Sequence, residues 1–211
     1  MLTKLISITP DTEKLIGYCA RVSNPQNQDN PDVSKLLAYC IKHQHWSIFE
    51  MAHMCVEINT TRAIAPQLLR HKSFSFQEFS QRYCDVDALS VPKLPHLRRQ
   101  DSKNRQNSID DLSDAIKDNL NEKIQTLYEV SRSLYKQGLE AGVCKETMRE
   151  ILPLGTPSRL YMAGSIRSWL HYCDLRCGNG TQLEHRRIAE SIKYILYREV
   201  PTIAEAMWGT E

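Results

Sequence analysis

A long amphipathic stretch decides the fold class of this chain of 211 residues: residues 116–139 read IKDNLNEKIQTLYEVSRSLYKQGL. Apolar residues recur in it at helical spacing, which predicts one long helix. Similar patterns, together with capping residues and prolines, predict further helices along the chain. These are expected over residues 12–22, 34–43, 61–70, 145–151, 165–175, 182–197 and 203–208.

Strands are predicted to be fewer. Residues 2–9 and 49–59 alternate between apolar and polar side chains, residues 74–83 look extended, and residues 160–163 indicate a short strand. The pattern contains no regular alternation of strands with helices. We therefore expect an α+β protein, with a small mixed or antiparallel sheet and long helices, in a single domain over residues 1–211.

Composition excludes several classes of protein. The chain has 27 Lys and Arg against 25 Asp and Glu, a formal net charge of +2, whereas a general nucleic-acid coat protein carries a large basic excess. No apolar run approaches the roughly 20 residues of a membrane span, and the N-terminus lacks a signal-peptide pattern. Seven scattered cysteines without a CxxC pair argue against a zinc ribbon or a disulfide framework, and indicate reduced thiols in a cytoplasmic protein.

The densest polar cluster lies at residues 70–83, RHKSFSFQEFSQRY. If its second half is extended, Glu78, Ser80 and Arg82 point to one face and suit a polar, anionic ligand. Gln67 and Arg70 are expected to share a face of the preceding helix, where Arg70 could bind a phosphate. The alternative for the three cations at residues 70–72 is a solvated helix end.

Two further clusters carry polar side chains. Arg167 and His171 are expected on one helix face beside Arg176, and Arg149 lies in a mostly apolar helix, so these residues could line a pocket. They could equally be surface residues whose stems pack. Three histidines fall within residues 43–53, but without carboxylates or cysteines at ligand spacing, so no metal site is expected.

The sequence contains no GxGxxG, P-loop, GxSxG or HExxH motif, so a dinucleotide would not be bound by a Rossmann turn. A competing function is suggested by the basic segment Lys93–Arg105, with three phenylalanines just upstream. Basic residues with aromatic neighbours could bind single-stranded RNA. The same segment could be no more than a solvated loop.

Residues 70–83 resemble the signature of the flavin-dependent thymidylate synthases (ThyX type), usually written RHRxxSxxExSxRY. Lys72 departs from it, because the family usually has arginine there and a planar fork becomes a point cation. Other stretches similar to the family are residues 20–25, 43–50, 65–71, 151–154 and 175–185. The signature residues that match are Arg70, His71, Ser75, Glu78, Ser80, Arg82 and Tyr83.

The resemblance implies an FAD enzyme that converts dUMP to dTMP. The methylene group would come from 5,10-methylenetetrahydrofolate and the reducing equivalents from NADPH through the flavin. The fold would be an α+β subunit of a homotetramer, with active sites formed between subunits. No membrane and no nucleic-acid partner is implied.

The resemblance also assigns residues to each ligand by their position in the motifs. His45 and Tyr83 would lie near the folate, and Ser165 and His171 depart from the residues usual in the family. FAD would contact Ser47, Arg70, His71, Lys72, Glu78, Ser165, Ile166, Arg167 and His171. The substrate dUMP would contact Gln67, Leu68, Leu69, Arg70, Glu78, Phe79, Ser80, Gln81, Arg82, Arg149 and Arg176.

Two of these residues are expected to be catalytic. Arg176 is the family's candidate for a cation at N3 and O2 of uracil, where it would stabilise the ionised ring. Ser80 would position and polarise the substrate, because nothing beside it would deprotonate a serine. No cysteine follows a proline, so the cysteine nucleophile of the other class of thymidylate synthase is not expected, and the hydride would come from the flavin.

Overall fold

The structure is a computed structural model, which describes residues 2–210. Its contacts divide the chain into two compact units, each built from separate segments. The sheet-and-helix unit comprises Met1–Ile58, Leu69–Gln77 and Tyr161–Glu211, and the long-helix unit comprises Asn59–Leu68 and Glu78–Leu160. Both units interleave along the sequence, and the single catalytic domain stays a prediction.

The central sheet has the strand order β1-β2-β6-β3. Strands β1 (Thr3–Ile8) and β2 (His53–Thr61) pair antiparallel, with an irregularity between Leu5 and Ser7. The other two strands are β3 (Ser75–Glu78) and β6 (Pro157–Ser165), and β2 and β6 each run through both units. This small sheet with long helices confirms the predicted α+β class.

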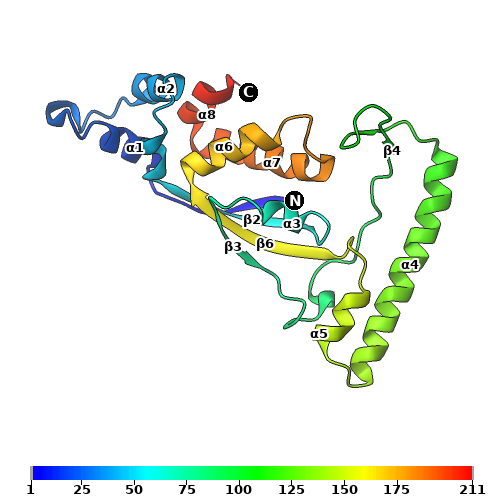
Figure 1. The fold of residues 1–211 in the computed structure, drawn as a ribbon. Helices are drawn as coiled ribbons and strands as arrows, with labels where there is room; N and C mark the ends of the chain where they lie inside the picture. The colour runs from blue at the N-terminus through cyan, green and yellow to red at the C-terminus, as the bar shows by residue number, and fades with distance from the viewer. Residues whose placement is uncertain (1, 211) are drawn as a thin grey trace. The chain divides into compact units, whose positions relative to one another are not determined.

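The sheet-and-helix unit is built around α6 (Ile166–Arg176) and α7 (Leu183–Glu199), which lie side by side in Figure 1. Trp169 on α6 is fully buried, and its indole N–H donates to the carbonyl of Met54 on β2 at 3.0 Å. Gly164 permits close packing here, because a Cβ at this position would lie 2.6 Å from the ring of Phe74. Helices α1 (Thr12–Ala20), α2 (Ser34–Lys42) and α8 (Pro201–Trp208) complete the unit.

The long-helix unit takes its name from α4 (Asp114–Glu140), which confirms the helix predicted over residues 116–139. Of its 27 residues only Ser131 and Tyr135 are buried. Ser131 donates to the carbonyl of Ile151 at 2.9 Å, which joins α4 to the turn after α5. The remaining elements of this unit are α3 (Ala65–Leu68), the two-residue strands β4 (Arg99–Gln100) and β5 (Ser108–Ile109), and α5 (Lys145–Met148).

Three predicted elements differ from the structure. The strand expected over 49–59 begins only at His53, because Trp46–Glu50 forms a 3-10 turn. The helix expected over 61–70 shrinks to α3, because β2 continues to Thr61. The extended segment expected over 74–83 ends at Glu78, because the amides of Tyr83 and Cys84 both donate to the carbonyl of Ser80 and close a turn.

Helices α6, α7, α2 and α8 lie within two or three residues of their predicted bounds, and α1 ends two residues earlier than expected. Strand β6 is longer than its predicted core of residues 160–163. No helix within residues 2–210 combines the length and the apolar character needed to cross a membrane.

Candidate functional site

Helix α6 carries most of the second predicted cluster. The Ser165 hydroxyl caps its N-terminus by accepting from the amide of Ser168 at 3.2 Å, which satisfies one of the unpaired donors of the first turn. Arg167 and His171 remain on the less buried side of this helix and Arg176 lies in its last turn. The shared helix face predicted for Arg167 and His171 is therefore confirmed.

Arg176 is held by the signature histidine. Its Nε–H donates to Nε2 of His71 at 3.0 Å. Burial and the neighbouring Arg176 both lower the pKa of His71, so the ring is neutral near pH 7 and has a lone pair to offer. Within residues 2–210 the two terminal guanidinium nitrogens of Arg176 form no hydrogen bond to the protein.

The His71 ring sits in a cluster of other rings. Its centroid lies 5.0 Å from Tyr172, 6.1 Å from His185 and 6.5 Å from Phe74, edge-on in each case. Tyr172 and His185 are buried and their side chains hydrogen bond at 3.1 Å. This packing restricts the orientation of the imidazole that receives Arg176.

At the other end of α6, Arg167 binds Glu50 at 2.9 Å. Hydrogen bonds from Ser165 and then Arg167 lower the pKa of Glu50 despite its partial burial, so the carboxylate is ionised at neutral pH. The exposed His171 ring packs edge-on against Trp46, with centroids 4.6 Å apart.

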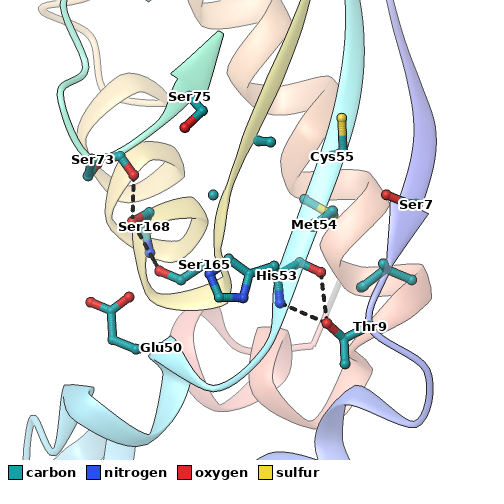
Figure 2. Close-up of a pocket in the computed structure, with 13 residues that line it drawn as sticks. Ser7, Thr9, Glu50, His53, Met54, Cys55, Ser73, Ser75, Ser165 and Ser168 are labelled. Atoms are coloured by element: carbon teal, nitrogen blue, oxygen red, sulfur yellow. Dashed lines mark hydrogen bonds between the residues drawn. The ribbon is translucent and has the colours of Figure 1, made fainter.

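Beside Glu50 and Ser165 is an open pocket of about 630 Å³ on the sheet-and-helix unit (Figure 2). Six of its thirteen lining residues carry a hydroxyl group. Ser168 donates to the carbonyl of Ser73 at 3.3 Å, and the Thr9 hydroxyl exchanges hydrogen bonds with the backbone of His53. Among the residues that the resemblance assigns to FAD, Ser165 lines this pocket. Its full lining is Ser7, Ile8, Thr9, Glu50, His53, Met54, Cys55, Ser73, Ser75, Ala163, Gly164, Ser165 and Ser168.

The remaining residues assigned to FAD differ in exposure. Ser47, Arg70 and Lys72 are exposed. Ile166 has no exposed surface, and its amide donates to the carbonyl of Ala52 at 2.9 Å, so its side chain belongs to the core. His45, assigned to the folate, is exposed and lies 6.1 Å from His43, ring to ring.

In the long-helix unit, Glu78 is fixed by two partners. Arg62 forms a short ion pair with its Oε1, and Ser158 donates to the same oxygen at 2.8 Å. The next residue, Phe79, donates its amide to the carbonyl of Arg159 at 2.8 Å. One carboxylate oxygen of Glu78 is thus saturated, and the carboxylate is held at the end of β3.

Beyond Glu78 the signature turns back on itself. Ser80 and Arg82 therefore do not share a strand face with Glu78, contrary to the prediction. Gln81 is buried, and its Nε2 has no hydrogen-bond partner among residues 2–210. Such an unpaired buried donor is costly unless a ligand satisfies it.

The cations of this unit are open to solvent. Arg82 Nε bonds to Glu146 at 2.7 Å, with 68% of its side chain exposed. Arg149 is exposed on the 3-10 turn after α5, and Tyr83 is 87% exposed.

The residues around α3 also differ from expectation. The helix face predicted for Gln67 and Arg70 is not formed, because α3 ends at Leu68. Leu68 is fully buried and Leu69 is 38% exposed.

Sequence reasoning missed several residues that hold the predicted ones. Glu50 and His185 lay inside stretches that resemble the family, so they could have been proposed. Arg62, Ser158 and Tyr172 gave no local signal, because their partners are distant in the sequence.

The two other sequence hypotheses can be compared with the structure. Among the described residues no group of three or more His, Cys, Asp or Glu side chains could hold a metal. The basic segment Lys93–Arg105 includes strand β4, where Arg99 pairs with Asp111 at 2.6 Å. The Arg99–Asp111 pair neutralises part of the charge of this segment internally, and His96 lies 2.9 Å from Asp110.

Comparison with known proteins gives a consistent result. Residues 4–202 match the family described as "Thymidylate synthase complementing protein". The chain is 53% identical to the "Flavin-dependent thymidylate synthase" of Synechocystis sp. over 92% of its length and 89% of the relative. It is 49% identical to the "Probable flavin-dependent thymidylate synthase" of Paramecium bursaria Chlorella virus 1, over 98% of its length and 99% of the relative.

A solved structure shares the fold. It is a UMP/dUMP methylase from Streptomyces cacaoi bound with 5-Br dUMP, with a TM-score of 0.82 and 24% identity, and the match covers 97% of this chain and 93% of the other. The family match extends over nearly all the elements described above, including the signature at residues 70–83. On these grounds the chain belongs to the family of flavin-dependent thymidylate synthases.

Proposed function

We propose that this protein is an FAD-dependent thymidylate synthase. It methylates dUMP to dTMP, taking the methylene group from 5,10-methylenetetrahydrofolate and the reducing equivalents from NADPH. Family membership supports the activity, and one observation carries its assignment to a site: the guanidinium of Arg176 is held by a neutral His71 and keeps its terminal nitrogens available. A fixed cation of this kind suits a ring that becomes negatively charged during the reaction.

The substrate half of the proposal rests on the long-helix unit and on Arg70. Arg70, Arg82 and Arg149 are exposed cations that can neutralise the dianionic phosphate of dUMP. The side-chain amide of Gln81, unpaired within the described part of the chain, offers a donor, and the fixed carboxylate of Glu78 offers an acceptor. Gln67, Leu68, Leu69, Phe79 and Ser80 complete the proposed dUMP site.

The residues of the sheet-and-helix unit fit a flavin nucleotide. The pocket of about 630 Å³ beside Ser165 is within the range of roughly 300–1,000 Å³ typical of small-molecule sites, and its hydroxyls suit ribose and phosphate oxygens. In this unit Ser47, Arg70, His71, Lys72, Arg167 and His171 would contact the cofactor, with Ser165 and the backbone of Ile166. Glu78 of the long-helix unit is also a proposed cofactor contact. When bound, FAD supplies the hydride.

Arg176 is the proposed catalytic cation. Its two terminal nitrogens can donate to O2 of uracil and, once the ring has ionised, to N3 as well, so this contact strengthens as the ring ionises, which lowers the barrier rather than the binding constant. Ser80 orients the substrate and does not attack it. His45 and the exposed ring of Tyr83 are placed near the folate in this proposal.

We extend the proposal to a homotetramer with shared active sites. One face of α4 exposes apolar side chains to solvent, each 41–59% exposed: Ile116, Leu120, Leu127, Val130 and Leu134. Apolar surface of this kind on a soluble domain commonly marks an interface. The competing RNA-binding function gains no support from the family match.

The first test is an absorbance spectrum of the purified protein, followed by addition of dUMP. We expect a flavin spectrum that dUMP perturbs, and formation of dTMP only when methylenetetrahydrofolate and NADPH are both present. A protein that stays colourless after reconstitution with FAD would contradict the proposal. Single-stranded RNA added in the same assay should leave the flavin spectrum unchanged.

A further inference from the structure

We propose that His71 is a positioning residue for Arg176: as a neutral imidazole it accepts the Nε–H of Arg176 and thereby aims the two terminal guanidinium nitrogens. This inference rests on the proposed function, in which Arg176 is the activating cation. It gives the signature histidine a role beyond the flavin contact that the family resemblance implies. The hydrogen bond of 3.0 Å between Arg176 Nε and His71 Nε2 carries the inference.

The ring cluster makes this hydrogen bond directional. Tyr172 and Arg176 approach His71 from α6, and His185 approaches it from α7. Phe74 lies three residues after His71 in the same segment. Tyr172 and His185 bind each other at 3.1 Å and have almost no exposed surface. The His71 ring therefore cannot turn freely, and its hydrogen bond to Arg176 fixes the orientation of the guanidinium.

The bond requires one protonation state of His71. A ring that accepts at Nε2 carries its proton on Nδ1, so a second proton would place two donors face to face and add a like charge. Burial and Arg176 both lower the pKa of His71. Burial, Arg176 and His71 lower the pKa of His185 to about 4. Burial raises the pKa of Tyr172, so Tyr172 and His185, which face His71, are both uncharged at neutral pH. Arg176 supplies the charge beside His71.

A low pH should therefore uncouple the pair. Below the lowered pKa of His71 the imidazolium repels Arg176, and the cation loses its fixed orientation although its charge persists. We expect the rate of the chemical step to fall in acid more than the affinity for dUMP falls. A purely structural role for His71 would give no such separation.

Two substitutions of His71 distinguish its role as a hydrogen-bond acceptor for Arg176 from its role in packing. His71→Gln places an amide oxygen near the former Nε2 and can still accept from Arg176, whereas His71→Phe fills the volume but cannot accept. At saturating FAD and dUMP, we expect His71→Phe to oxidise reduced flavin roughly 10–100-fold more slowly, as for the loss of a hydrogen bond to a charged group. The rate of His71→Gln should stay within about threefold of the parental rate, and it should no longer fall in acid.

The matched control is His96→Gln, which changes a histidine paired with Asp110 in the long-helix unit. It should leave the rate and its pH profile unchanged. A parental rate in His71→Phe would overturn the inference. So would a His71→Gln variant that is as slow as His71→Phe, or whose rate falls in acid as the parental rate does.

A measurement without turnover keeps the inference testable if His71→Phe fails to fold. Nitrogen-15 NMR of histidine-labelled protein should give His71 the neutral pattern, with its proton on Nδ1, at pH 7. Arg176→Ala should raise the pKa of His71, because a neighbouring cation is removed. An unshifted pKa, or a proton on Nε2, would overturn the inference. Failure of the proposed function would appear separately, as absence of flavin uptake or of dTMP.

Discussion

The two units hold their polar residues in opposite ways. In the sheet-and-helix unit, Arg176 is tied to His71, which is enclosed by buried rings. In the long-helix unit, Arg82 and Arg149 are open to solvent, and Arg82 pairs with the exposed carboxylate of Glu146. A side chain fixed before binding can stabilise charge that develops later, without reorganisation. An exposed cation must instead be ordered by the ligand, so it contributes mainly to binding.

Glu78 is the exception within the long-helix unit. Its side chain is only 18% exposed, and Arg62 and Ser158 saturate one of its oxygens. The unit thus combines one preorganised acceptor with several solvent-exposed cations. The contrast predicts effects on rate from one unit and effects on affinity from the other.

The largest effect is expected at Arg176. Arg176→Ala and Arg176→Lys should slow flavin oxidation by roughly 10²–10³-fold, by analogy with the loss of an oxyanion-hole donor, while dUMP affinity changes far less. Lysine should not rescue the rate, because a point charge cannot hold N3 and O2 together. The measurement is single-turnover oxidation of pre-reduced enzyme by methylenetetrahydrofolate at saturating dUMP.

The control for Arg176 is Arg198→Ala, which removes an exposed arginine from the end of α7. It should leave the single-turnover rate unchanged. If the Arg176→Ala variant oxidises its flavin at the parental rate, Arg176 is not the activating cation, and the proposed contrast between the two units is wrong. The activating cation would then have to be Arg70, Arg82 or Arg149.

The second effect concerns the exposed cations. Arg149→Ala and Arg82→Ala should each weaken dUMP binding by about 1.5–3 kcal/mol, the usual contribution of a hydrogen bond to a charged group. The rate at saturating dUMP should change little. Calorimetric titration with dUMP measures the loss, with Arg105→Ala as a control from the basic segment. Unchanged affinity in both variants would move the phosphate site elsewhere.

The third effect is on stability in acid. His185 is fully buried, and its pKa falls to about 4 in the folded protein, whereas an unfolded histidine titrates near 6.5. Between these values the unfolded chain binds more protons, so stability falls as pH falls from 6.5 to 4, by up to about 1.4 kcal/mol per pH unit for one proton.

His185→Gln should flatten this part of the curve, and above pH 6.5 the two proteins should show parallel pH dependence. Urea unfolding at pH values from 4.5 to 7.5 measures the difference. His43→Gln is the control, because His43 is exposed. Equal slopes for His185→Gln and the parent would mean that the buried ring is not the acid-sensitive group.

Sequence patterns predicted the local structure well where periodicity was long. The bounds of α4 and α7 follow from apolar repeats over many turns, which no tertiary contact overrode. The short helix expected from residue 61 failed because strand pairing of β2 continued through Thr61, and local propensity is weak against such pairing.

The candidate site was predictable in its residue types but not in its contacts. The signature pointed to Arg70, His71, Glu78 and Arg82 through the family resemblance. The partners that hold them are distant: Ser158 lies 80 residues after Glu78, and Arg176 lies 105 residues after His71. A single sequence contains no periodic signal for pairs at such separations. The side chains that are held by partners could therefore not be distinguished from those that are exposed to solvent.

The smallest effect tests how weakly the exposed cation Arg82 is held by its partner. Arg82 bonds to Glu146 at 2.7 Å, and both side chains are more than half exposed, so the pair contributes at most about 1 kcal/mol. Arg82 must leave Glu146 to bind the phosphate. Glu146→Gln should therefore strengthen dUMP binding by up to about fivefold, and the gain should shrink as salt screens the exposed charges. The gain should vanish when Arg82→Ala is added, which calorimetry of the double variant can measure. Weaker binding in Glu146→Gln would instead mean that Glu146 orients Arg82 toward the phosphate, and that this cation is as preorganised as Arg176.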